Sequence, residues 1–321
     1  MPQVLRAATR RLATAAAAAT LLLAGCGTQE PQTAGEVPTR LASYELATGE
    51  QTYEATSTTD GTMGFGDALR TAMGPSAGAL TQDSPISVQL SMNVTQTVAE
   101  DGPDRKVTVR IDSVDGRVKA FGVDQPVDEQ MLAKAGSSEV TYTMSSDGTT
   151  NVAGGSQLGG LGLGTLGAGV GGSCPRLPEG GVEAGQEWKT SQRVPVGGVE
   201  ATVPSTNTYA IEADSGTVTS RTDGPVDVTV DFAEFAKSSP SLAGVGNLAG
   251  MTMHIAGTAD LTSTCVLGLP GQELRSVESG GHISLTMSLA GTAHDPELAK
   301  LGEGEFLHMD VDTTSKMHQT A

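Results

Sequence analysis

The sequence predicts a mainly β fold: a curved antiparallel sheet or half-barrel built from two related halves, with a few short helices. Three observations predict it. Apolar and polar residues alternate along many segments, which is the pattern of a strand with one buried face. Glycine-containing turns separate these segments at hairpin spacing. Segments with helical spacing are few and short. Because alternating strands have one polar face, the sheet is expected to pack on one side only.

The first alternating segments lie on either side of an acidic turn. Residues 86–98 alternate, the turn 100–104 follows, and residues 107–111 alternate again. Asp115-Gly116 then lies between two valines, which predicts a further hairpin. Three more hairpins are predicted around Asp147-Gly148, Asp214-Ser215-Gly216 and Gly280-Gly281.

Two short helices are predicted between the strands. Residues 126–135 begin with a proline two residues after Asp124 and end before Gly136, which are typical helix boundaries. Residues 296–301 are framed in the same way by an aspartate and a glycine.

Residues 1–25 are organised like a bacterial lipoprotein signal peptide. Three arginines precede an uncharged segment of 14 residues, which is shorter than the roughly 20 needed to span a bilayer. The segment ends in Leu23-Ala24-Gly25-Cys26, which resembles the lipobox, and the resemblance implies a lipid anchor on Cys26. An ordinary secretory signal with an incidental cysteine is the alternative. Residues 26–40, rich in Pro, Gln and Thr, are expected to form a flexible tether.

Two cysteines remain in the folded part of the chain, Cys174 and Cys265. An even pair in an extracytoplasmic compartment predicts a disulfide. Two free buried thiols are the alternative, because the sequence does not show that the two Cα atoms approach each other. Their spacing is not that of a zinc site.

The chain divides into two β-rich ranges, 41–152 and 174–321. Residues 47–53 and 184–188 resemble each other, since in both a glycine and an acidic or amide pair lead into an aromatic residue. Two related halves of typical domain size would explain this, and chance similarity in a chain rich in Gly and Thr is the alternative.

The segment 153–173 between the halves is apolar and rich in glycine, with ten glycines among residues 153–172. One interpretation is a flap that rests over an apolar pocket, in which glycine permits close approach and leucine supplies contact. The other is a low-complexity insertion without a fixed structure. The flap interpretation nominates a set of ligand contacts: Leu158, Leu161, Leu163, Leu166 and, from the following strand, Trp188. Core packing is the ordinary role for a single tryptophan.

Three motifs together resemble an uncharacterised family of bacterial, actinobacterial-type lipoproteins. They are the lipobox, Glu45-Leu46-Ala47-Thr48-Gly49, and a mid-chain segment in which Leu177-Pro178 precedes Val182-Glu183-Ala184-Gly185-Gln186-Glu187-Trp188. The last is a Val-x-x-Gly-x-x-Trp strand start. The family implies no activity. More distantly, the lipobox, size and strand pattern are similar to LolA-like lipoproteins, whose half-barrel holds an acylated lipid.

Charge and motif content narrow the classes of function. The formal charge of −18 becomes −21 without residues 1–25, because 16 basic residues then face 37 acidic ones. This disfavours nucleic acid as a partner. The Gly-x-Ser-x-Gly match at 74–78 lacks the strand and helix that a nucleophile elbow needs. The acidic run from Glu303 to Asp312, with His308, is expected to be a solvated strand or tail rather than a metal site.

Taken together, the sequence predicts a lipid-anchored binding protein on the extracytoplasmic side of the cell membrane. It is not expected to be an enzyme, and no cofactor is expected. The ligand would be a lipid or another apolar molecule held on the concave face. The alternative is an interaction or scaffold lipoprotein of the cell envelope without a ligand cavity.

Overall fold

The computed structural model describes most of the two β-rich ranges. The described residues are 39–46, 48–67, 83–128, 139–152, 174–196, 199–231, 250–269, 273–291 and 304–320. The predicted signal peptide, Cys26 and nearly all of the tether lie outside them, as do the segment 153–173, the serine motif at 74–78 and the predicted helix 296–301.

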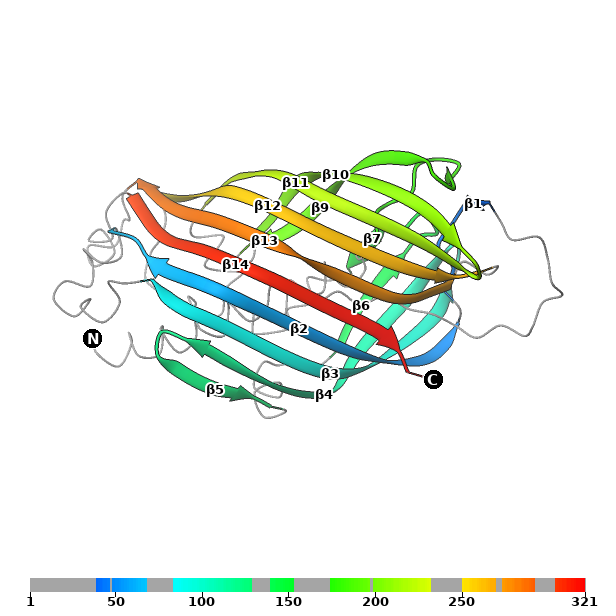
Figure 1. Cartoon of the computed structure of the whole chain (residues 1–321), viewed down its shortest axis with the longest axis horizontal. Coiled ribbons are helices and arrows are strands. Elements are labelled where there is room, and N and C mark those ends of the chain that lie inside the picture. Colours follow the sequence, from blue (N-terminus) through cyan, green and yellow to red (C-terminus); the bar gives the residue numbers. More distant parts are fainter. Residues whose placement is uncertain are drawn as a thin grey trace.

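Most described residues belong to antiparallel strands, as predicted (Figure 1). One sheet has twelve strands, and a second pairs only β1 with β8. The strands are β1 (Arg40–Leu41), β2 (Gly49–Phe65), β3 (Ser84–Asp101), β4 (Asp104–Ala120), β5 (Val123–Val127), β6 (Glu139–Met144), β7 (Thr150–Val152), β8 (Val182–Glu183), β9 (Glu187–Val196), β10 (Val199–Glu212), β11 (Ser215–Asp231), β12 (Met251–Gly268), β13 (Glu273–Gly291) and β14 (Gly304–Gln319).

The order of strands in the large sheet is β7-β6-β4-β3-β2-β14-β13-β12-β11-β10-β9, with β5 added to β4. The first range therefore starts in the middle of the sheet at β2 and proceeds outward to β7. The second starts at the opposite edge with β9 and returns to the middle. There β14 pairs with β2 from Leu307↔Phe65 to Gln319↔Tyr53, so one sheet unites both ranges.

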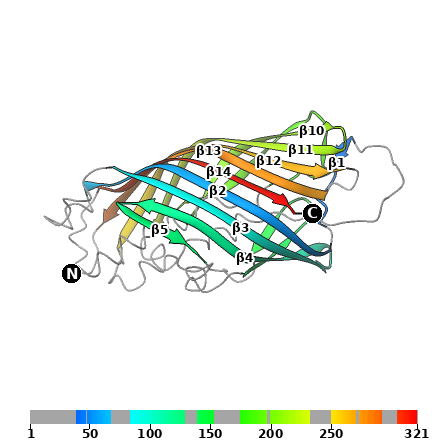
Figure 2. The same ribbon diagram turned by 60° about the horizontal axis from the view of Figure 1, so that its bottom comes forward.

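The sheet is strongly curved but does not close into a barrel (Figure 2). Within the described residues, the two strands at the ends of the strand order, β7 and β9, are not hydrogen-bonded to each other, and β5 also has β4 as its single partner. β7 has three residues and β9 has ten, so the two edges offer very different lengths for pairing.

Alternation along the strands separates a buried concave face from a polar convex one. On β3, for example, Ile86, Val88 and Leu90 are buried while Pro85 and Gln89 are exposed. The same period continues on β12, with Met253 and Ile255 fully buried. Successive side chains of a strand point to opposite faces, so each strand contributes one apolar row to the concave side.

Two predicted hairpins are wrong, and the predicted helix 126–135 begins in strand. Asp115-Gly116 lies inside β4, and Gly280-Gly281 lies inside β13. A Cβ on Gly116 would lie 2.3 Å from the Gln89 carbonyl oxygen, and one on Gly281 would lie 2.0 Å from that of Asp260. These glycines permit close approach of neighbouring strands rather than a turn. Pro126 belongs to β5, and residues 129–135 lie outside the described part.

Candidate functional site: the concave face and its capped end

The two ends of the sheet carry different connections. At one end, here called the capped end, β3 turns into β4, β6 into β7 and β10 into β11 through short turns. These include the predicted turns 100–104, Asp147-Gly148 and Asp214-Ser215-Gly216, which are confirmed. At the other, far end, β4 turns into β5 and β9 into β10.

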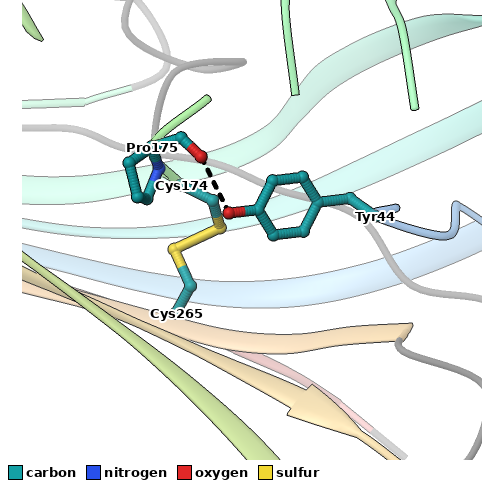
Figure 3. Close-up of a disulfide and its surroundings, with 4 residues drawn as sticks. All are labelled: Tyr44, Cys174, Pro175 and Cys265. Atoms are coloured by element: carbon teal, nitrogen blue, oxygen red, sulfur yellow. Dashed lines mark hydrogen bonds between the residues drawn. A yellow bond between two sulfur atoms is a disulfide. The ribbon is translucent and has the colours of Figure 1, made fainter. Parts of the chain in front are cut away.

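A short non-strand segment, 174–178, crosses the capped end, and we call it the strap. Its first residue forms a disulfide with Cys265 on β12, and the two Cα atoms lie 5.8 Å apart (Figure 3). The pairing predicted from the sequence is thus confirmed. Both cysteines are buried, at 5% and 0% exposure.

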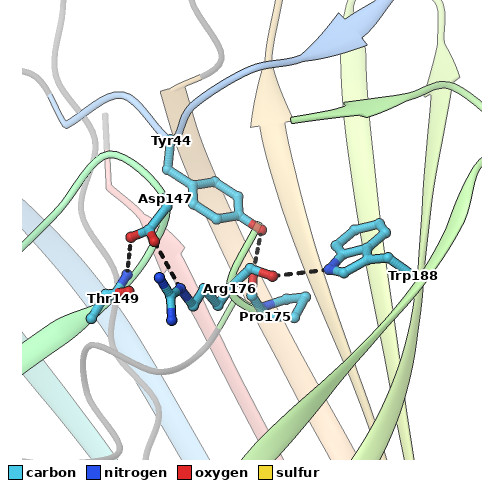
Figure 4. Close-up of polar contacts among 6 residues, drawn as sticks. All are labelled: Tyr44, Asp147, Thr149, Pro175, Arg176 and Trp188. Carbon is cyan, nitrogen blue, oxygen red and sulfur yellow. Dashed lines mark hydrogen bonds and ion pairs between the residues drawn. The ribbon is translucent and has the colours of Figure 1, made fainter. Parts of the chain in front are cut away.

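The strap also joins the two unpaired edges of the sheet (Figure 4). On one side, the carboxylate of Asp147 in the β6–β7 turn accepts a hydrogen bond from Arg176 Nε at 2.8 Å. The backbone carbonyl of Asp147 accepts a second bond from the Leu177 amide, also at 2.8 Å. On the other side, the indole N–H of Trp188 on β9 donates to the Arg176 carbonyl at 2.9 Å. The capped end is therefore closed by side chains and one strap instead of by strand pairing.

Tyr44 covers the strap from the chain that follows β1. Its hydroxyl donates to the Pro175 carbonyl at 2.8 Å, and its ring is buried at 3% exposure. Burial raises the pKa of Tyr44 well above its usual value, so the phenol stays neutral and remains a donor. Gly148 packs beside the ring, where a Cβ would lie 2.9 Å from it.

Asp147 is held as an anion by its neighbours. Partial burial acts to raise its pKa, but hydrogen bonds from Thr149 and Arg176 outweigh this and lower it. The Thr149 amide donates to Asp147 Oδ1 at 2.9 Å. The carboxylate thereby fixes both its own turn and the strap.

Polar side chains cross the middle of the concave face in two adjacent rows, which we call the hydroxyl belt. In the first row, strand register aligns one residue from each of six neighbouring strands: Asn207, Ser220, Ser263, Ser279, Ser315 and Ser57. The second row lies toward the far end and contributes Ser205, Thr222, Thr313 and Thr59. All except Ser279 are buried.

The belt is satisfied largely by its own members. The Ser205 hydroxyl donates to Asn207 Oδ1 at 2.9 Å and lies 2.6 Å from the Ser220 hydroxyl. Because Ser205 has a single O–H and uses it on Asn207, Ser220 must be the donor of the second bond. The Asn207 amide donates to the Trp188 carbonyl and to Thr190. Ser279 and Ser315 are hydrogen-bonded across strands at 3.1 Å.

Apolar zones lie on both sides of the belt. Toward the capped end, the inward positions include Val94, Val218, Val277 and Met317. Toward the far end they include a larger set of aliphatic residues: Met63, Val226, Met253, Ile255, Ile283, Leu285 and Val311. The concave face thus alternates apolar, hydrogen-bonding and apolar along the strands.

Two buried polar atoms on this face have no hydrogen-bond partner in the described structure: Gln96 Nε2 and the Tyr209 hydroxyl. Gln96 is 1% exposed and Tyr209 is fully buried. Buried polar groups are normally paired, so each of these two atoms requires an explanation.

The histidines that the structure describes lie on the convex face, each beside at least one carboxylate. His254 contacts Asp227, and His282 contacts Asp310 and Asp312. His308 lies between Glu305 and Asp83, at 2.7 and 2.8 Å. Over the described residues, no group of three or more His, Cys, Asp or Glu side chains is arranged to hold a metal ion. Of the two alternatives for residues 305–312, a strand or a tail, the structure shows the strand, as part of β14.

Of the residues nominated from the sequence, only Cys174, Cys265 and Trp188 lie in the described part, and the strap brings them to one place. Trp188 is 7% exposed and hydrogen-bonded to the strap, which is the packing role. Leu158, Leu161, Leu163 and Leu166 lie outside the described residues. Sequence reasoning missed the hydroxyl belt and Gln96. Their only signal was a Ser, Thr or Gln at a position where the alternation called for an aliphatic residue.

Comparisons with known proteins place the chain in no family. No protein-family model matches it, and no curated protein matches it. Among solved structures, one of lipid–protein interactions in lipovitellin matches at a TM-score of 0.39 and 12% identity. The match covers 86% of this chain and 26% of that one, so this chain spans about a quarter of the lipovitellin chain.

Two further structures match more weakly. DynF from the dynemicin biosynthesis pathway of Micromonospora chersina has a TM-score of 0.20 at 10% identity, covering 92% and 94% of the two chains. OpdQ of Pseudomonas aeruginosa has a TM-score of 0.22 at 6% identity, covering 85% and 99%. With TM-scores below 0.5, none of the three assigns a function to this chain.

Within the part of the chain that the structure describes, no helix combines the length and apolar character needed to cross a bilayer.

Proposed function

We propose that this chain is a lipid-anchored extracytoplasmic binding protein whose concave face holds a lipid or another apolar ligand. One observation carries the proposal. One face of a curved twelve-stranded sheet is lined by aliphatic side chains, and the only other sheet in the described residues is the two-stranded β1–β8 pair at the capped end. A concave, mostly apolar surface with a few hydrogen-bonding groups is the usual form of a small-molecule site.

The described residues offer little support for catalysis. His254, His282 and His308 lie on the convex face and contact carboxylates, away from the apolar rows. The residues at the centre of the concave face are hydroxyls and one amide, which bind and orient rather than transfer protons at neutral pH. Binding is therefore the function that this arrangement supports best.

The test is the lipid content of the protein purified from the cells that produce it. The full chain carrying Cys26→Ser is used, so that an acyl group on the chain itself is not counted as ligand. Native mass spectrometry is expected to show a co-purified lipid. Ile283→Thr on the concave side of β13 should lower the occupied fraction, and Thr286→Ile on the convex side of the same strand should not.

A protein that is always empty, with both variants indistinguishable from the wild type, would contradict this proposal. It would favour the alternative of an envelope interaction lipoprotein without a ligand. Thermal melting of both variants shows whether either substitution has simply unfolded the chain.

The anchor is tested separately from the ligand. Cells that express the full chain are fed an alkyne-tagged palmitate, and the purified protein is probed for the tag. Labelling of the wild type and its loss in Cys26→Ser would support acylation at Cys26. Labelling that survives the substitution would contradict it.

A further inference from the structure

The side-chain nitrogen of Gln96 is buried and has no hydrogen-bond partner in the described structure. The residue lies on the concave side of β3 and is 1% exposed. Its cross-strand neighbour on β2 is Gln51, whose Oε1 already accepts the Tyr53 hydroxyl at 2.7 Å. A polar group is thus present at this point of the face, and its N–H donors are not used.

The surroundings of Gln96 are uncharged. The next inward residues on β3 are Val94 and Val98. The residue facing it on β4 is Val109, which is 3% exposed. The other residues that pair with Val94, Gln96 and Val98 across β2 and β4 are also uncharged: Gly49, Gln51, Tyr53, Val107 and Ile111.

An unused donor in such a place destabilises the ligand-free fold, because the amide loses its water without gaining a partner. An aliphatic residue would fit the apolar row of β3 better. The amide is therefore explained if something outside the described protein atoms accepts its hydrogen bond.

We propose that the Gln96 amide donates a hydrogen bond to a neutral acceptor oxygen of the bound ligand, an ester or amide carbonyl or a hydroxyl. This inference rests on the proposed function and narrows it to an esterified or otherwise neutral polar lipid. A free carboxylate fits poorly, because a buried anion needs a cationic partner and none of the residues paired with Val94, Gln96 and Val98 is cationic. The nearest cation along this row of β4, Arg105, lies beyond Val107 and donates to the Leu46 carbonyl at 3.4 Å. A plain hydrocarbon would leave the donor unused.

The experiment compares three probes on the full chain carrying Cys26→Ser. They are 1,2-dioleoylglycerol, oleic acid and hexadecane, which share long apolar chains and differ in their oxygen atoms. Gln96→Leu removes the donor, and Gln89→Leu is the matched control, because Gln89 is exposed on the opposite face of the same strand. Affinities are measured by displacement of a fluorescent lipid.

The wild type is expected to prefer dioleoylglycerol. Gln96→Leu should weaken that ligand about five- to tenfold, the value of one net hydrogen bond, and leave hexadecane unchanged. The same substitution should raise the melting temperature of the ligand-free protein, because it removes an unused buried donor. A glutamine with only a structural role would give the reverse, a lower melting temperature when replaced. Gln89→Leu should change neither affinity.

Two results separate failure of this inference from failure of the proposed function. If the probes bind but Gln96→Leu leaves the preference for dioleoylglycerol intact, or if oleic acid binds best, the role of Gln96 is overturned and lipid binding stands. If no probe binds the wild type, the proposed function fails and this role fails with it. Gln96→Met provides a second variant should the leucine variant not fold.

Discussion

The capped end and the far end of the sheet are held in different ways. At the capped end, a disulfide, the strap and Tyr44 join segments that are more than 90 residues apart in the chain. At the far end, Phe121 stacks on Phe65 with ring centroids 4.8 Å apart, and His308 joins β14 to Asp83. Among the described residues, one end is fixed by a covalent bond and by hydrogen bonds that are mostly partly buried, and the other by a ring contact and partly exposed ion pairs.

The difference shows how an open sheet can be closed at one end only. β7 and β9 are not paired, so the strap replaces the hydrogen bonds that a closed barrel would have there. We expect ligand to enter away from the strap, and substitutions at the capped end to cost more stability than substitutions at the far end.

The largest effect is expected from the disulfide. Replacing Cys174 and Cys265 together by alanine should lower the free energy of unfolding by about 2–5 kcal/mol, because the bond closes a long loop in the unfolded chain. Urea unfolding followed by the fluorescence of Trp188, the single tryptophan, measures it. Wild-type protein kept in reductant is the control and should match the variant. Equal midpoints for oxidised and reduced wild type would show that the strap does not need its covalent link.

A smaller effect is expected for Tyr44→Phe. The substitution removes the donor to the Pro175 carbonyl inside the capped end, at a cost of about 1–2 kcal/mol. The same urea titration measures it. Ser43→Ala, which removes an exposed hydrogen bond next to it, should cost far less. If Tyr44→Phe and Ser43→Ala lowered the free energy of unfolding equally, the burial of Tyr44 would not be what makes its hydrogen bond stabilising.

Arg176→Gln should cost about 1 kcal/mol or less. Its side chain is 67% exposed, so solvent weakens the attraction to Asp147. The variant keeps the Arg176 carbonyl that Trp188 binds, so the indole should stay in place. An unchanged emission maximum of Trp188 checks this. A cost as large as that of the disulfide would mean that the ion pair itself closes the sheet.

The smallest effect, a few tenths of a kcal/mol, is expected at the far end from His308→Gln. Burial acts to lower the pKa of His308, but Glu305 and Asp83 outweigh it and raise the pKa above its usual value. A raised pKa in the folded state stabilises the protein below the ordinary value of about 6.5, and this contribution is lost as the pH rises through the folded pKa. Melting temperatures of both proteins should therefore differ at pH 5.5 and converge near pH 9. A difference that grows with pH would contradict the assignment.

Much of the fold followed from local pattern. The alternation in residues 86–98 predicted a one-sided strand, and the turns at 100–104 and Asp147-Gly148 lie where expected. Asp115-Gly116 and Gly280-Gly281 gave the same local signal, yet both lie inside long strands. A glycine required by a turn and one required by a close neighbouring strand cannot be told apart without that neighbour.

The candidate site was less accessible to sequence reasoning. Cys174 and Cys265 could be paired because only two cysteines remained. The row from Asn207 to Ser57 depends on the register of six strands, including the pairing of β14 with β2, whose aligned residues Ser315 and Ser57 are separated by most of the chain. Gln96 is one glutamine among several, and only its burial without a partner distinguishes it.

The sequence by itself determined that the chain forms antiparallel strands with one apolar face, because the period of two is a local property of the backbone. It also determined that a disulfide was available within the second range, between Cys174 and Cys265. Only the tertiary structure decided that the ranges form one sheet joined at β2 and β14, that the strap closes one end, and that the hydroxyls align into a belt. Those features depend on contacts between residues far apart in the chain, and such contacts are set by register and curvature, which no local pattern encodes.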